Sequence, residues 1–175
     1  MKKNKPVTYE NYPAWIIIVI TILSLLIYLA GVYIMFTLHW ITGILYIIYI
    51  FFIEGSVYRE GCAYCCYYGK LCAFGRGVLA KFIVKKGNPK KFCERRLTSK
   101  DFIPTMLIIL IPLIVGIALL ISRGFNALIL AALIYPIFSW FALNPIIYGK
   151  LACPHCKQGK KCCPALDFFS KPKKK

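Results

Sequence analysis

The chain has 175 residues, of which 59% are hydrophobic and 17% charged, and its formal net charge is +17. Its apolar residues form long blocks separated by lysine-rich stretches, a composition that excludes an ordinary soluble domain and indicates a membrane protein. In a soluble protein this charge would suggest nucleic-acid binding, but here it follows the membrane topology derived below, so we expect no nucleic-acid partner.

Four apolar segments reach the length of about 20 residues that a helix needs to cross a bilayer. They are 14–36, 40–58, 102–121 and 125–143, the last extending at most to Tyr148. The second segment reaches this length only if its helix continues past Ile53 and carries Glu54 near the lipid headgroups. The first is longer than the apolar part of a signal peptide and has no cleavage pattern after it, which favours an uncleaved anchor.

Lysine and arginine residues fall almost entirely on one side of these segments. Three precede the first segment, eleven lie between the second and third, eight follow the fourth, and only Arg123 lies between the third and fourth. Because basic residues stay on the cytoplasmic side, we expect a multi-pass protein of the cell membrane with both termini in the cytoplasm. We also expect the basic loops to attract anionic lipid headgroups.

The sequence predicts an all-α membrane protein with four transmembrane helices arranged as two related hairpins and a small Cys-rich cytoplasmic cap. After each hairpin comes a C-x2-C motif, then Gly-Lys and further cysteines. The predicted parts are an N-terminal segment (1–13), a first hairpin (14–58), a Cys-rich basic loop (59–101), a second hairpin (102–148) and a Cys-rich basic tail (149–175). Parallel repeats of this kind would bring both motifs to one face of the membrane.

Within the basic loop, Val78, Leu79, Phe82 and Ile83 recur at helical spacing while lysines fall elsewhere on the wheel. This pattern predicts a short helix in the headgroup layer, ended by the Gly-Asn-Pro sequence at 87–89. The alternative is a solvated basic loop.

The cysteines are the candidate chemical groups. Clustered cysteines in a reducing compartment indicate metal binding or redox chemistry rather than structural disulfides. A C-x2-C turn presents two sulfurs to one ion, and two such turns complete a tetrahedral zinc site. The predicted metal ligands are Cys62, Cys65, Cys72, Cys153, Cys156, Cys162 and Cys163. Neighbouring lysines would favour the thiolate forms.

Two arrangements of the ligands fit the spacing. In the first, Cys62, Cys65, Cys153 and Cys156 share one ion. In the second, each motif closes its own site, the first motif using Cys72 with or without Cys66 and the second using Cys162 and Cys163. An iron–sulfur cluster is the alternative cofactor, because Cys-Pro at 163–164 is similar to the end of a bacterial ferredoxin motif. Uncoordinated, redox-active or palmitoylated thiols are a further alternative, and Cys93, far from other cysteines, is interpreted as a lone thiol.

The expected function follows from what the spans contain. Apart from tyrosines, we expect no ionisable side chain inside them, which argues against a pump. The sequence has no catalytic motif, which favours a non-enzymatic role. We therefore expect a scaffold or accessory subunit with structural zinc, binding lipid, a protein partner or a second copy. A membrane redox protein is the first alternative, and metal handling or transport is the second.

Overall fold

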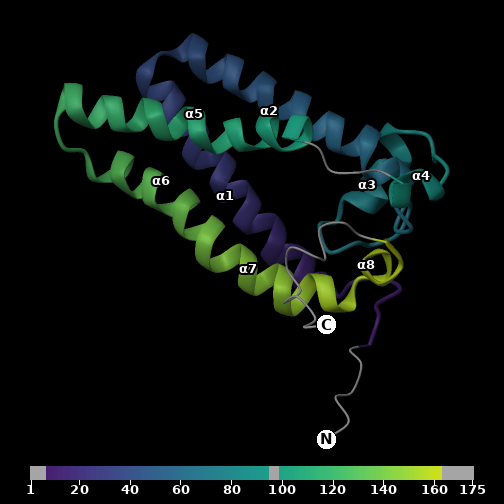
Figure 1. Ribbon diagram of the computed structural model, residues 1–175. Coiled ribbons are helices and arrows are strands. Elements are labelled where there is room, and N and C mark those ends of the chain that lie inside the picture. Colours follow the sequence, from purple (N-terminus) through teal and green to yellow (C-terminus); the bar gives the residue numbers. More distant parts are fainter. Residues whose placement is uncertain (1–6, 95–98, 163–175) are drawn as a thin grey trace, which may run out of the picture. The chain divides into compact units, whose positions relative to one another are not determined.

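All the regular secondary structure in the described part of the chain is helical. The computed structural model (Figure 1) describes residues 7–94 and 99–162, with only the helical backbone for 99–102. The α-helices are α1 (Ala14–Leu38), α2 (Trp40–Glu60), α3 (Arg76–Ile83), α4 (Lys90–Glu94), α5 (Ser99–Arg123), α6 (Ala127–Phe138), α7 (Asn144–Ile146) and α8 (Lys157–Cys162). The other helical turns are η1 (Cys62–Tyr64), η2 (Ser139–Leu143), η3 (Ile147–Ala152) and η4 (Cys153–His155).

Four helices are long and apolar enough to cross a membrane, which confirms a membrane protein with four candidate spans. These spans are Ala14–Leu38, Trp40–Tyr64, Ile103–Arg123 and Ala127–His155. The second and fourth run further than the sequence predicts. Each ends inside a C-x2-C motif, so both motifs form the last turns of a span and do not follow it through a loop.

The fourth span changes its helical geometry on both sides of a proline. The wide π-type turns η2 and η3 flank α7, which contains Pro145. Proline lacks the amide proton for the regular helical hydrogen bond and clashes with the carbonyl four residues earlier. The chain absorbs this defect by widening the helix and does not break it.

Contacts divide the chain into two compact units. Unit 1 comprises Met1–Thr21, Val57–Arg96 and Asn144–Lys175, and unit 2 comprises Ile22–Ser56 and Leu97–Leu143. Unit 1 therefore contains both cysteine motifs, α3, α4 and α8, together with the first turns of α1. Unit 2 contains the apolar middle of the hairpins.

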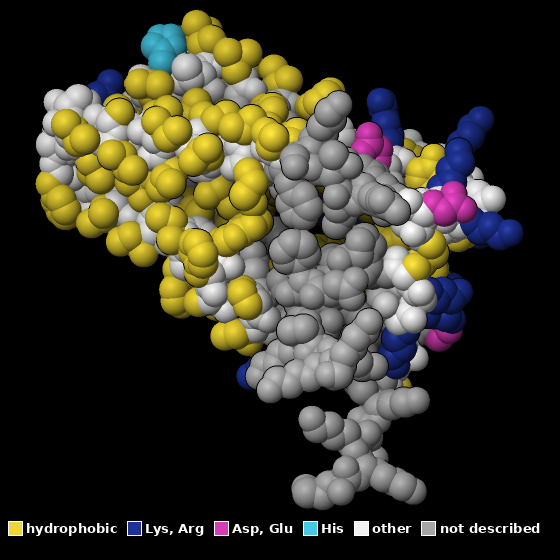
Figure 2. All heavy atoms as spheres, viewed as in Figure 1, with side chains coloured by type: hydrophobic (Ala, Val, Ile, Leu, Met, Phe, Trp, Pro, Cys, Tyr) yellow, Lys and Arg dark blue, Asp and Glu magenta, His cyan; other side chains and the backbone are white. Residues whose placement is uncertain are grey.

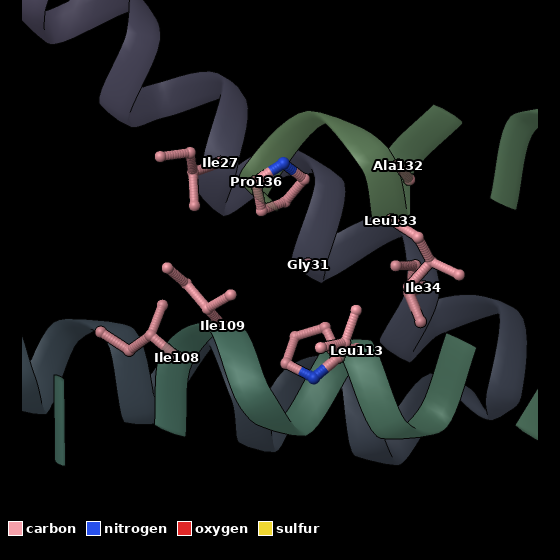
Figure 3. A pocket seen from close by; sticks show the side chains of 10 residues that line it. Ile27, Gly31, Ile34, Ile108, Ile109, Leu113, Ala132, Leu133 and Pro136 are labelled. Atoms are coloured by element: carbon pink, nitrogen blue, oxygen red, sulfur yellow. The ribbon is translucent and has the colours of Figure 1, made fainter. Parts of the chain in front are cut away.

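Unit 2 is a packed apolar core. One buried cluster joins α1, α2 and α5 through Met35, Tyr46, Ile50, Ile53 and Ile108, and a second joins α1, α5 and α6 through Ile34, Leu119, Ile129 and Leu133. Figure 3 shows aliphatic side chains of α1, α5 and α6 converging on a pocket of about 10 Å³. This volume is far below that of a ligand site, so the pocket is a packing defect in the core.

Tyr46 satisfies a backbone group that a proline exposes. Pro112 in α5 has no amide proton to donate to the carbonyl of Ile108, four residues earlier. The hydroxyl of Tyr46 donates to this Ile108 oxygen at 2.5 Å. A tyrosine from α2 thus replaces the missing helical hydrogen bond, as membrane helices require.

We predict that Tyr46→Phe lowers the stability of the protein by about 1 kcal/mol, the usual magnitude of an interhelical hydrogen bond in a membrane. Unfolding by increasing SDS in mixed micelles, followed by circular dichroism, measures the change. Tyr33→Phe is the control, because Tyr33 is 38% exposed in α1. Equal midpoints for the two variants would show that the Ile108 carbonyl does not need this donor.

Glu54 lies deeper in the hairpin than the sequence analysis expected. It accepts a hydrogen bond from the hydroxyl of Tyr28, and Tyr28 lies near the middle of α1. The pair belongs to unit 2, where Tyr28 packs against the first buried cluster. The second span therefore carries a carboxyl group bonded by a tyrosine, a polar pair that membrane helices tolerate when they face a neighbouring helix.

Candidate functional site

The two C-x2-C motifs adopt the same type of backbone turn. Each is a short 3-10 turn, η1 or η4, in which the amide of the second cysteine donates to the carbonyl of the first. The N–O distance is 3.3 Å from Cys65 to Cys62 and 3.2 Å from Cys156 to Cys153. The second cysteines are both extended, with φ −77° and ψ 147° at Cys65 and φ −77° and ψ 121° at Cys156.

The two motifs adjoin one another in unit 1. The backbone amide of Cys66 donates to the side-chain oxygen of Gln158 at 3.0 Å, and the amide of Lys157 donates to the hydroxyl of Tyr67 at 3.0 Å. Burial and, after it, the nearby Cys156 raise the pKa of Cys66, so thiols of the two motifs lie near one another. Residues about 90 positions apart in the chain thus form one junction.

An N-terminal segment, residues 7–12, binds both motifs, and we call it the N-terminal clasp. The amide of Tyr12 donates to the Leu71 carbonyl at 2.9 Å, and its buried hydroxyl donates to the Ala152 carbonyl at 2.6 Å. The hydroxyl of Tyr67 donates to the Tyr9 carbonyl at 2.7 Å. Tyr12 therefore holds the end of the first motif against the start of the second.

His155 is part of the same contact. Its Nδ1 lies 2.6 Å from the carbonyl oxygen of Val7, and its ring stacks on Tyr9 with centroids 4.6 Å apart. The residue between the two cysteines of the second motif thus holds the clasp.

Glu10 forms ion pairs with a lysine from each motif, Lys70 at 2.9 Å and Lys157. Hydrogen bonding to Lys157 and then to Lys70 lowers the pKa of Glu10 from 4.5 to about 2. The carboxylate is 62% exposed, so salt screens these pairs and their effect is modest. They add an electrostatic link across the junction.

The depressed pKa of Glu10 predicts how its contribution depends on pH. Because the folded-state pKa lies below the unfolded value, the contribution is complete above about pH 5 and is lost as pH falls through about 2. The difference in melting temperature between wild type and Glu10→Gln should follow this course and shrink in high salt. A difference that persists at pH 2, or is unaffected by salt, would contradict the ion-pair origin.

Backbone amides donate hydrogen bonds to cysteine sulfurs in both motifs. Such donors stabilise thiolate charge and are typical of the surroundings of metal–thiolate centres. The pairs are Tyr67 to Cys65, Gly77 to Cys72 at 3.3 Å and Gly159 to Cys156 at 3.4 Å.

Burial of the sulfurs opposes the effect of these donors. It raises the pKa of Cys65 to about 12, with the Tyr67 amide acting in the opposite direction and the nearby Cys66, Cys72 and Cys156 adding to the rise. Burial also raises the pKa of Cys66. Both cysteines are therefore thiols at neutral pH in this structure.

Cys93 and Cys162 form a disulfide that joins α4 to α8, with their Cα atoms 5.1 Å apart. The prediction of a lone Cys93 thiol is therefore wrong, because α4 and α8 pack together although the two cysteines are 69 positions apart. While this bond exists, Cys162 cannot act as a thiolate ligand. Cys163 lies outside the described residues.

Within 7–94 and 99–162, no three cysteine, histidine or acidic side chains lie close enough together to hold a metal ion. The five remaining predicted ligands lie in the adjoining motifs and are Cys62, Cys65, Cys72, Cys153 and Cys156. No family model, curated protein or solved structure matches this chain. A functional assignment therefore depends on these residues themselves.

No sequence motif marks the residues that hold the junction together. Tyr12, Tyr67 and Gln158 are buried there, and Glu10 bridges it. The sequence feature that could have indicated this contact is Glu10, the one acidic residue in a tyrosine-containing segment just before the first span.

Proposed function

We propose that this chain is a scaffold or accessory subunit of a membrane assembly, in which a structural zinc ion links the two cysteine motifs. The observation that carries the proposal is the set of backbone amides directed at sulfurs of both motifs. Zinc binds four thiolates tetrahedrally, and N–H donors to sulfur offset the negative charge of such a centre. Zinc would add a metal–thiolate link to the hydrogen bonds, ion pairs and disulfide that already join these segments.

The junction favours one shared site over two separate sites. Cys65 and Cys156 come from different motifs, and the hydrogen bonds from Cys66 to Gln158 and from Lys157 to Tyr67 bring these motifs together. A separate site in the second motif would need Cys162, whose sulfur is bonded to Cys93. The shared ligands would be Cys62, Cys65, Cys153 and Cys156, with Cys72 as the alternative fourth donor.

The distribution of basic residues supports a cytoplasmic position for this site. Of the 23 lysine and arginine residues, 22 lie on the side of the predicted spans that carries both motifs. The protein would then be a multi-pass component of the cell membrane with both termini in the cytoplasm. A protein partner or a second copy would bind through the same basic face.

Metal analysis of the protein tests the proposal directly. The full chain is purified in detergent without oxygen, and bound zinc, iron and acid-labile sulfide are determined together with visible absorption. We expect about one zinc per chain and a colourless sample. Iron with equimolar sulfide would indicate an iron–sulfur cluster in place of zinc and would favour a redox protein. Metal-free protein would reject a metal centre of either kind.

A redox role is the second candidate, and the disulfide between Cys93 and Cys162 favours it. Its reduction would take two electrons and two protons from a dithiol, which would itself become a disulfide. Equilibration with mixtures of reduced and oxidised glutathione, followed by mass spectrometry after alkylation, gives the reduction potential. A potential within the cytosolic glutathione range would support a redox function. A much lower one would indicate a structural bond.

A further inference from the structure

Helix α3 has apolar residues on both of its faces. Gly77 and Ala80 are buried against the rest of unit 1. On the opposite side, Leu79 is 52% exposed, Phe82 80% and Ile83 58%. Positions 79, 82 and 83 lie at helical spacings of three and four, so they form one outward stripe. In water such a stripe would be an exposed apolar patch that needs a partner.

Contacts at the start of α3 place it beside two spans. A Cβ on Gly75 would lie 3.0 Å from the side chain of Ile17, in the first turn of α1. The ring of Phe74 stacks on Tyr148 of the fourth span, with centroids 5.5 Å apart. Ile17 is only three residues inside its span, which is about 5 Å of helix. α3 therefore begins at the boundary between hydrocarbon and headgroups.

Basic side chains surround the outward stripe. Figure 2 shows lysine and arginine side chains gathered around α3, α4 and α8. In and after α3 the exposed lysines are Lys81, Lys85, Lys86, Lys90 and Lys91. Between residues 61 and 94 the sequence has one acidic residue, Glu94. An apolar stripe edged by lysines complements the acyl chains and negative headgroups of an anionic membrane surface.

We propose that α3 and the lysines after it bind anionic phospholipid headgroups of the membrane that the spans cross. The stripe of Leu79, Phe82 and Ile83 enters the boundary of the acyl chains. The lysines contact the lipid phosphates, with Lys81, Lys85 and Lys86 nearest to the stripe. This lipid-binding site goes beyond the zinc-linked scaffold, and none of its residues is a cysteine.

The contacts between α3 and the spans favour lipid over a protein partner as the occupant of the stripe. Through Gly75 and Phe74, the start of α3 is held against Ile17 and Tyr148 of two candidate spans. Because α3 has only eight residues, its stripe would lie close to the lipid around these spans. Each lysine near an anionic surface contributes about fivefold to binding, so three of them contribute on the order of 100-fold.

The test places a fluorescent reporter on the stripe. Phe82→Trp in the full-length protein is reconstituted into nanodiscs of neutral and anionic phospholipid, and either lipid is brominated in turn to quench nearby tryptophan. We expect strong quenching above the wild-type background of Trp15, Trp40 and Trp140. Brominated anionic lipid should quench more than brominated neutral lipid. Glu94→Trp, an exposed position off the stripe, is the control and should be quenched little.

A triple variant tests headgroup recognition. With Lys81, Lys85 and Lys86 changed to glutamine in the Phe82→Trp background, the two brominated lipids should quench equally. If brominated anionic lipid still quenched this variant more strongly than brominated neutral lipid, the proposal that these lysines recognise anionic headgroups would be overturned. Quenching of the Phe82→Trp reporter no greater than that of the control would overturn membrane contact altogether. A cross-linked dimer that shields the reporter from both lipids would instead assign the stripe to a second copy, which also contradicts the proposal.

Discussion

Replacing Cys65 by serine is expected to abolish zinc binding, whereas replacing Cys66 by serine is expected to leave one zinc per chain. Cys65 closes the first C-x2-C turn, accepts the Tyr67 amide and lies near Cys72 and Cys156. Cys66 is its direct neighbour with the same chemistry, but it falls outside the repeated spacing. Comparing the two variants therefore shows whether zinc needs a sulfur at position 65 or only a cysteine nearby.

The expected loss of affinity for Cys65→Ser is more than about 100-fold, since losing even an outer-shell partner costs 10- to 100-fold. Zinc per chain, and competition with a chromophoric chelator, measure it in detergent-solubilised protein. Equal zinc content in the two variants would exclude Cys65 as a ligand. Equal loss would show that the site depends on the general integrity of the loop.

Removal of the proposed zinc ion should also loosen the junction, because structural metal binding is coupled to folding. Hydrogen exchange in the presence of a chelator is expected to accelerate at the amides of Cys66 and Lys157, which bond across the two motifs. Amides in the apolar core of unit 2, such as those near Ile129, should keep their protection. Unchanged exchange at Cys66 and Lys157 would mean that the hydrogen bonds, ion pairs and disulfide of unit 1 hold the motifs together without zinc.

Helix length and apolar periodicity could be predicted from the sequence because both are local properties. The four spans follow from uninterrupted apolar blocks, and α3 follows from the spacing of Leu79, Phe82 and Ile83. The residues at which the second and fourth spans end could not be predicted in the same way. Their last turns contain polar and cysteine residues that become helical only because they pack within unit 1.

The junction could be predicted only in outline, because it depends on contacts between distant residues. The spacing of the cysteines indicated two similar turns, and the structure gives them the same local conformation. Nothing in the local sequence indicated that Tyr12 would bond to Ala152, 140 positions away, or that Cys93 would reach Cys162.

Gly77→Ala is expected to be strongly destabilising to unit 1. A Cβ at Gly77 would lie 2.3 Å from the carbonyl oxygens of both Tyr67 and Lys70, so backbone would have to move. The Gly77 carbonyl also accepts the amide of Gly69 at 2.8 Å, and Gly69 needs its glycine because its φ is +75°. Displacing α3 would break this turn and withdraw the Gly77 amide from the sulfur of Cys72.

The overpacking should cost about 3 kcal/mol. The gain of about 1 kcal/mol from placing alanine in a helix does not offset it. Gly55→Ala is the matched control, because it also lies within a helix and its added Cβ would meet nothing within 4 Å. The two variants are compared by thermal unfolding in detergent. Unfolding is monitored by the rate at which unit 1 cysteines react with a fluorogenic thiol reagent. Early and rapid labelling is expected for Gly77→Ala alone, and matching curves would show that α3 does not pack tightly on residues 67–70.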